Sequence, residues 1–110
     1  MILGCSALAA LADSNPSFPG GEEALKAYVA QHTRYPQVAM DNGVEGIVVV
    51  GFSVMPDGSL NSLKVMKMID PDLEKEAMRV VGSMPAWIPA EKNGTPVEAP
   101  SKVEIPFILE

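Results

Sequence analysis

The chain has 110 residues, of which 47% are hydrophobic and 20% charged, a composition typical of one small folded domain and unlike that of a disordered chain. Its formal net charge of −6 makes nucleic acid and anionic lipid poor partners, because such a surface repels phosphate. One histidine and one cysteine are too few for most His/Cys metal sites, and Cys5 alone cannot form an internal disulfide.

The first segment, MILGCSALAALA, is apolar and uncharged. It is too short to span a bilayer, which requires about 20 residues. Ala10-Leu11-Ala12 matches the cleavage pattern of a secretory signal. We therefore expect residues 1–12 to be the remnant of an export signal or a short N-terminal helix, and a lipidation signal at Cys5 is a third alternative. Residues 13–21 are expected to form a loop, because they are rich in Pro, Gly, Ser and Asn.

Helical spacing begins at Glu22, where two carboxylates suit the positive end of a helix. Leu25, Tyr28, Val29 and His32 then follow the spacing of one helical face. Pro36 stops this helix near Tyr35, because a residue before proline avoids helical geometry. A weaker helix is expected over residues 37–43, ending at Asn42-Gly43.

The stretch GIVVVGFSV, residues 46–54, is the strongest predicted strand. Val48, Val50, Phe52 and Val54 lie on one face of this strand, and Ile47 and Val49 lie on the other. Because both faces carry apolar residues, we expect part of the second face to be covered as well. Pro56, Asp57 and Gly58 are typical of a turn, so residues 59–68 should return as the hairpin partner. Leu60 and Leu63 differ in phase, which predicts a bulge near Asn61-Ser62.

Asp70-Pro71 is typical of a helix start, with a capping side chain followed by proline at the first helical position. The expected buried face of this helix comprises Leu73, Ala77, Val80, Val81 and Met84. Gly82 and Pro85 should end the helix, and residues 91–101 read as a polar loop. The fold class is therefore predicted as α+β, with a small antiparallel sheet of about three strands and two helices packed on one face, in a domain covering residues 22–110.

The last stretch, KVEIPFILE, alternates like a strand and yet contains Pro106. Proline cannot donate to a ladder, so a strand that carries it is usually at the edge of a sheet. An edge strand offers unpaired backbone groups to a partner. The sequence leaves open whether the nitrogen of Pro106 faces the sheet or the free edge.

Other candidate residues favour structural roles. His32 suits a helix end, the acids between Asp70 and Glu76 suit a helix N-terminus, and Trp87 suits a core position beneath a loop. Four methionines are expected to fill gaps in the core: Met66, Met68, Met78 and Met84. No arrangement of catalytic residues, cofactor motif or metal-ligand spacing is apparent in the sequence. We therefore expect that the protein is not an enzyme and that it binds no cofactor, metal ion or small-molecule substrate.

Several short motifs follow one another along the chain: Tyr35-Pro36, the alternation of Gly46, Val48, Val50, Phe52 and Val54 into Asp57-Gly58, Trp87 with Pro89-Ala90, Asn93-Gly94-Thr95-Pro96-Val97, and Val103, Ile105, Pro106 and Phe107. In this order they resemble the TonB C-terminal domain family, over residues 18–109. The lead-in FPGGEEAL is similar to versions common in Bacteroidetes-type bacteria.

The resemblance implies a periplasmic protein-binding module that contacts outer-membrane receptors for energy-coupled uptake. In the family, a short N-terminal segment of a TonB-dependent receptor joins the sheet as an added strand. Carried over to this sequence, the implied partner-binding residues are Lys102, Val103, Glu104, Ile105, Pro106, Phe107 and Ile108, with Tyr35 and Pro36 as further contacts.

The transducers of this family also carry a membrane anchor and a proline-rich linker, and the sequence departs from that pattern. We expect energy coupling to be supplied elsewhere, with anchoring to the inner membrane in a longer native chain as an alternative. A second hypothesis is an interaction, sensory or dimerisation domain of an envelope protein, in which the same edge pairs two copies as a homodimer without binding a receptor.

Overall fold

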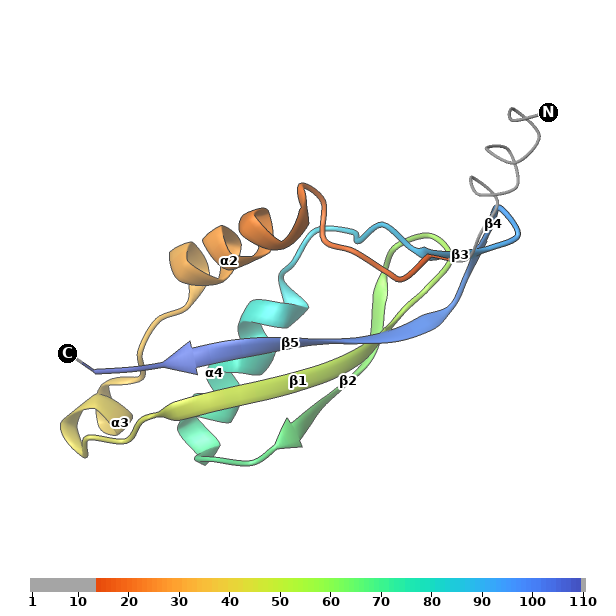
Figure 1. Ribbon diagram of the computed structural model, residues 1–110. Coiled ribbons are helices and arrows are strands. Elements are labelled where there is room, and N and C mark those ends of the chain that lie inside the picture. Colours follow the sequence, from red (N-terminus) through yellow and green to blue (C-terminus); the bar gives the residue numbers. More distant parts are fainter. Residues whose placement is uncertain (1–13, 110) are drawn as a thin grey trace.

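The computed structural model describes residues 14–109, so the expectation for residues 1–12 lies outside the described part (Figure 1). The elements in chain order are α2 (Gly21–His32), α3 (Gln37–Asp41), β1 (Gly46–Val54), β2 (Leu60–Lys67), α4 (Pro71–Gly82), β3 (Ala90–Lys92), β4 (Thr95–Val97) and β5 (Ala99–Phe107). The predicted helices and the two long hairpin strands are thus confirmed, and α3 is the weaker helix expected after Pro36.

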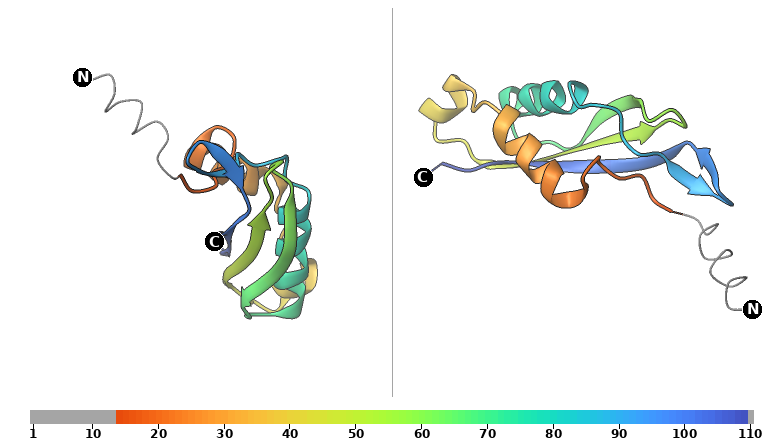
Figure 2. Two further views of the ribbon diagram at one scale, coloured as in Figure 1. Left: turned by 90° about the vertical axis from the view of Figure 1, so that its right-hand side faces the viewer. Right: turned by 90° about the horizontal axis from the view of Figure 1, so that it is seen from above.

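Three strands form the main sheet in the order β2-β1-β5, with both pairings antiparallel. Within the described chain, β5 is therefore an edge strand, as its proline predicted, and β2 is the other edge. Figures 1 and 2 show α4 lying along one face of the sheet and α2 lying beside β5. The α+β class is confirmed.

The core lies between the sheet and α4. Alternate residues of β1 and the apolar stripe of α4 meet there, because strand side chains repeat every two residues and helix side chains every three to four. The fully buried side chains include Val48, Val50, Val54, Leu73, Val80, Val81, Ile105 and Phe107. Asp70 caps α4 by accepting hydrogen bonds from the backbone N–H groups of Asp72 and Leu73, as the sequence predicted.

A bulge in β2 confirms the expected change of phase. The register passes from Gly51↔Lys64 to Ser53↔Asn61, so β2 contributes one more residue than β1, and Ser62 has a φ of 56°. This extra residue brings both Leu60 and Leu63 against the core.

Trp87 is buried, at 5% exposure, between the Phe18 and Phe52 rings. Its ring centroid lies 5.8 Å from that of Phe18 and 5.1 Å from that of Phe52, and both contacts are edge-on. Trp87 is thus a core residue, as predicted from the sequence.

The segment expected to be a polar loop instead contains a short hairpin of β3 and β4. Asn93 and Gly94 form its turn with φ values of 55° and 80°, the geometry that an Asn-Gly pair favours. The backbone N–H of Ser14 donates to the carbonyl of Glu91 in β3, so the chain that leads into α2 lies against this hairpin.

The second face of β1 is covered only in part, as expected: Gly51 is buried and Val49 is half-buried, whereas Ile47 is 43% exposed. The assignment of four methionines to the core is wrong for two of them, because Met66 is 55% exposed and Met68 is 81% exposed. A second register shift in β2, beside Val49 and Val50, makes Met66 the unpaired residue, and its side chain lies over Gly51 on the open face. Met78 and Met84 do pack against the core.

Candidate functional site

The outer edge of β5 is defined by the direction of its backbone groups. In an antiparallel ladder, alternate residues bond to one neighbour and the residues between them point to the other side. The N–H of Met55 donates to the carbonyl of Ser59, which extends the β1–β2 ladder by one pair. Odd-numbered residues of β1 therefore bond to β2, and even-numbered residues bond to β5.

The register then assigns the groups of β5. Val50 pairs with Val103 and Val48 with Ile105, so Val103 and Ile105 bond to β1. Lys102 and Glu104 alternate with these residues along β5, so their backbone N–H and carbonyl groups point to the free edge. Pro100 and Pro106 share this phase, which explains why the pairing continues through both without interruption.

The free edge thus carries more acceptors than donors. Pro100, Lys102, Glu104 and Pro106 each point a carbonyl outward, whereas only Lys102 and Glu104 have an N–H to donate. The question that the sequence left open about Pro106 is resolved by this phase, because its nitrogen faces outward. An incoming strand would find both donors and acceptors only at Lys102 and Glu104.

A groove of about 740 Å³ lies between this edge and α2. One stripe of the helix and its C-cap residue form one wall, with the spacing of a single helical face: Glu22, Leu25, Lys26, Val29, Ala30 and the C-cap Thr33. The groove is therefore bounded on one side by a helix face that carries the apolar residues Leu25, Val29 and Ala30, and on the other side by the free edge of β5.

The opposite wall contains most of the residues carried over from the resemblance, namely Lys102, Val103, Glu104, Pro106, Phe107 and Ile108, together with Tyr35. Ile105 does not line the groove, because its side chain is fully buried in the core. Pro36 does not line it either, because it lies at the start of α3.

Tyr35 is a structural part of this wall. Its hydroxyl donates to the backbone carbonyl of Val44, and its ring meets that of Phe107 edge-on at 5.5 Å. Burial, with a smaller contribution from the negative charge of Glu45, raises the pKa of Tyr35. The phenol therefore stays protonated and holds the end of β5 against the loop before β1.

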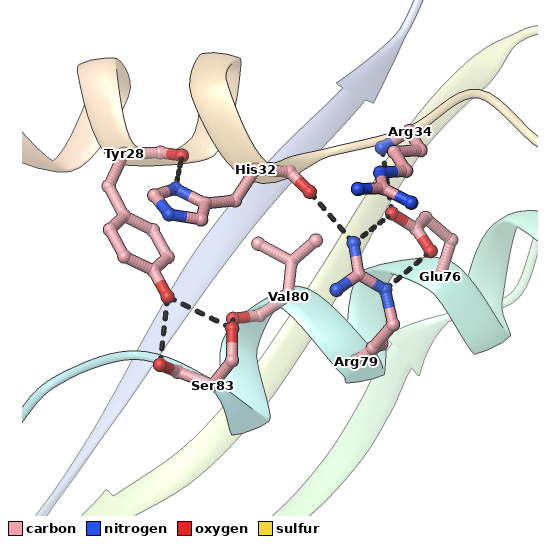
Figure 3. A network of polar contacts seen from close by, with 7 residues as sticks. All are labelled: Tyr28, His32, Arg34, Glu76, Arg79, Val80 and Ser83. Atoms are coloured by element: carbon pink, nitrogen blue, oxygen red, sulfur yellow. Dashed lines mark hydrogen bonds and ion pairs between the residues drawn. The ribbon is translucent and has the colours of Figure 1, made fainter.

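A network of polar contacts fixes α2 against α4 (Figure 3). The Tyr28 hydroxyl donates to the Ser83 carbonyl at 2.8 Å, and Arg79 donates to the His32 carbonyl at 2.7 Å. The His32 ring stacks on that of Tyr28 at 3.9 Å, so the lone histidine has a structural place at the helix end. These contacts hold the outer wall of the groove in position.

Glu76 is the acceptor at the centre of the network. Its carboxylate accepts from Nε of Arg79 at 2.9 Å and from the backbone N–H of Arg34 at 2.7 Å, and it also forms an ion pair with Arg79. Hydrogen bonding from Arg79, aided by the Arg34 N–H and opposed by partial burial, lowers the pKa of Glu76. The charged carboxylate is therefore the form that the folded chain favours.

We expect Glu76→Gln to lower the free energy of unfolding by about 1–2 kcal/mol at pH 7, through loss of charge-assisted hydrogen bonds. Because the folded pKa lies below the ordinary value of 4.5, the contribution is present above that pH and is lost as the pH falls through the folded pKa. Urea unfolding from pH 7 to pH 3 should show the variant and the parent converging. Glu98→Gln, at an exposed position, controls for the change in net charge; a Glu76→Gln deficit that persists unchanged at pH 3 would contradict this account.

Periodicity alone missed the helical wall of the groove. Leu25, Tyr28, Val29 and His32 were expected to share one helical face, and the first three do pack against the core. Within that face, Tyr28 and His32 bond to the end of α4 and to Arg79, whereas Leu25 and Val29 line the groove. The two stripes are adjacent, so a single apolar pattern covers both. Only the position of α4 separates them.

No three His, Cys, Asp or Glu side chains within residues 14–109 are placed to hold a metal ion together. None of the helices described is both long and apolar enough to cross a bilayer.

Comparisons with known proteins agree with this architecture. The family model described as Gram-negative bacterial TonB protein C-terminal matches residues 31–109. Protein TonB of Haemophilus influenzae is 38% identical over 94 residues, which cover 79% of this chain and 32% of that protein. Protein TonB of Helicobacter pylori is 34% identical over 53 residues, or 48% of this chain and 19% of that protein. The chain thus spans about a third or less of these relatives.

Solved structures give the same result. Two solution structures of the Helicobacter pylori TonB C-terminal domain superpose with TM-scores of 0.59 and 0.57, at 25% and 26% sequence identity. The first comparison covers 77% of both chains, and the second covers 79% of this chain and 94% of the other. With the sheet order, the edge strand and the family match in agreement, the chain belongs to the family of TonB protein C-terminal domains of Gram-negative bacteria.

Proposed function

We propose that this domain is a periplasmic protein-binding module that takes the N-terminal segment of a TonB-dependent outer-membrane receptor as an added strand on β5. Its role is binding, and the energy for uptake is supplied through other parts of a TonB system. No covalent chemistry is required, because the proposed interaction is a backbone ladder supplemented by side-chain contacts.

The proposal depends mainly on one observation: the backbone N–H and carbonyl groups of Lys102 and Glu104 point outward from the unpaired edge of β5. Unpaired ladder groups are strong and directional, and an extended peptide satisfies them at little structural cost. Pro100 and Pro106 flank the two donors, so indiscriminate pairing along the whole edge is disfavoured while a short segment still fits.

The test is an amide NMR titration of the full 110-residue chain with synthetic peptides from receptor N-termini. The largest shifts are expected at Lys102 and Glu104, with slowed exchange of their two amide hydrogens on binding. Smaller shifts should follow along α2, across the groove. The amides of β2 serve as an internal control, because β2 is the opposite edge.

Two outcomes would overturn the proposal. Shifts confined to β2 would place the partner on the other edge. Absence of shifts, together with relaxation rates of a dimer and protected amides at Lys102 and Glu104 in the peptide-free chain, would make the β5 edge an assembly surface.

A further inference from the structure

Helix α2 presents two stripes with different contacts. The first stripe, with Tyr28 and His32, is fixed to α4 by the hydrogen bonds to Ser83 and from Arg79. The second stripe, with Leu25 and Val29, faces the groove beside β5. Val29 is buried and packs in the core, whereas Leu25 is half-buried and leaves part of its apolar side chain accessible.

The family model matches residues 31–109, whereas the match to protein TonB of Haemophilus influenzae covers 79% of this chain and therefore extends into α2. The helix lies beside the edge strand that the sheet leaves open, as both ribbon figures show. A strand added to β5 would therefore have α2 over its core-facing side. The receptor-binding role that we propose for the edge does not by itself require such a wall.

The register determines which partner side chains would meet the helix. Partner residues opposite Lys102 and Glu104 would share their solvent-facing side, and partner residues opposite Val103 and Ile105 would point to the helix side of the sheet. On that side the accessible apolar lining of the groove includes Leu25 and Ala30, and the buried side chains of Val29 and Phe107 line it beneath them. Every second partner residue is thus placed in an apolar environment.

We propose that α2 is the selectivity element of this site, and that it takes an extended segment with apolar side chains at alternate positions and polar side chains between them. This inference rests on the proposed strand addition and names the chemistry of the strand. Leu25 and Val29 contact the apolar side chains, whereas Lys102 and Glu104 select the polar ones.

A single extended segment fits better than a second copy of the domain. Antiparallel pairing of two β5 edges would continue one sheet and would bring both α2 helices to the same face, because the symmetry axis is perpendicular to the sheet. Each α2 already forms the wall beside its own β5 edge, so the two helices would compete for the same space. A peptide without a helical layer avoids this conflict.

The first experiment fills the groove from the helix side. Ala30 is exposed and lines the groove, whereas Ala27 is exposed on the same helix and does not. With a synthetic peptide of about eight residues that carries valine at alternate positions, Ala30→Trp should weaken binding by about tenfold or more, and Ala27→Trp should change it by less than about twofold. Thermal unfolding of both variants reports any loss of folding.

The second experiment exchanges the chemistry of the peptide. Threonine in place of each valine keeps shape and strand propensity and adds a hydroxyl to the buried side. The threonine peptide should bind about tenfold more weakly to the parent chain. Leu25→Ala should weaken the valine peptide by about fivefold and leave the threonine peptide nearly unchanged, which a purely structural role of Leu25 would not produce.

The outcomes separate the two proposals. Binding that depends on the β5 edge but is indifferent to Ala30→Trp and to the valine–threonine exchange would overturn the role of α2 and leave strand addition intact. Binding of neither peptide, with receptor peptides also inactive, would overturn both. A concentration-dependent dimer that Ala30→Trp disrupts would show that a second copy occupies the groove.

Discussion

Gly58→Ala is expected to lower the free energy of unfolding by about 3 kcal/mol, a large share of the 5–15 kcal/mol typical of a whole domain. Gly58 has a φ of 88°, which an alanine adopts only at a cost of about 1 kcal/mol or more. A Cβ at this position would lie 2.3 Å from the backbone oxygen of Trp87 and 3.3 Å from the Cβ of Ala86. The chain before β3 would have to move.

That movement would disturb several contacts at once. The Trp87 N–H donates to the Gly58 carbonyl at 2.8 Å, so the same displacement breaks a hydrogen bond. It would also shift the Trp87 ring away from Phe18 and Phe52, whose edge-on contacts close this end of the core. Loss of packing around a buried aromatic accounts for the remainder of the expected effect.

Gly21→Ala is the matched control. Gly21 has nearly the same φ, 87°, and a Cβ there would meet nothing within 4 Å. The control should cost about 1 kcal/mol from backbone strain alone. Urea unfolding followed by fluorescence of Trp87, the single tryptophan, measures both variants. Equal losses for the two glycines would mean that the approach to Trp87 imposes no strain.

Local signals predicted α4 and β1 closely, and each had a direct physical cause. Asp70-Pro71 fixes the start of α4, and the spacing of Leu73, Ala77 and Val80 fixes its buried side. The bulge near Ser62 was predictable because two leucines of opposite phase both required burial. These features depend on neighbours in the sequence.

Features that depend on distant pairing could not be predicted in this way. The direction of the Pro106 nitrogen follows from the β1–β5 register, which no local pattern encodes. Assigning Ile105 to the contact surface treated the strand as one unit, whereas its side chain and backbone both face inward. The α2 wall was missed because the partner of each helical stripe depends on where α4 lies. The Asn93-Gly94 hairpin did have a local signal, and the surrounding polar residues obscured it.

Lys102→Pro is expected to weaken binding of receptor-type peptides by about tenfold, because it removes one of the two outward N–H donors of β5. The fold should tolerate the change, since Pro100 and Pro106 already occupy the same phase and the ladder to β1 does not use the Lys102 nitrogen. Lys102→Ala is the matched control, because it removes the charged side chain and keeps the N–H.

The double variant Lys102→Pro, Glu104→Pro removes both outward N–H donors, so residues 100–106 would present no donor to a partner strand. Peptide affinity measured by calorimetry should fall below detection for the double variant, while Lys102→Ala should retain affinity within about threefold of the parent. Unfolding curves verify that each variant is folded at the temperature of the assay. If the double variant is folded and still binds as tightly as the parent, then backbone pairing on β5 is not how the partner is held. If only the proline variants lose affinity, the backbone of this edge is the recognition element, and the side chains around the groove adjust which segment it accepts.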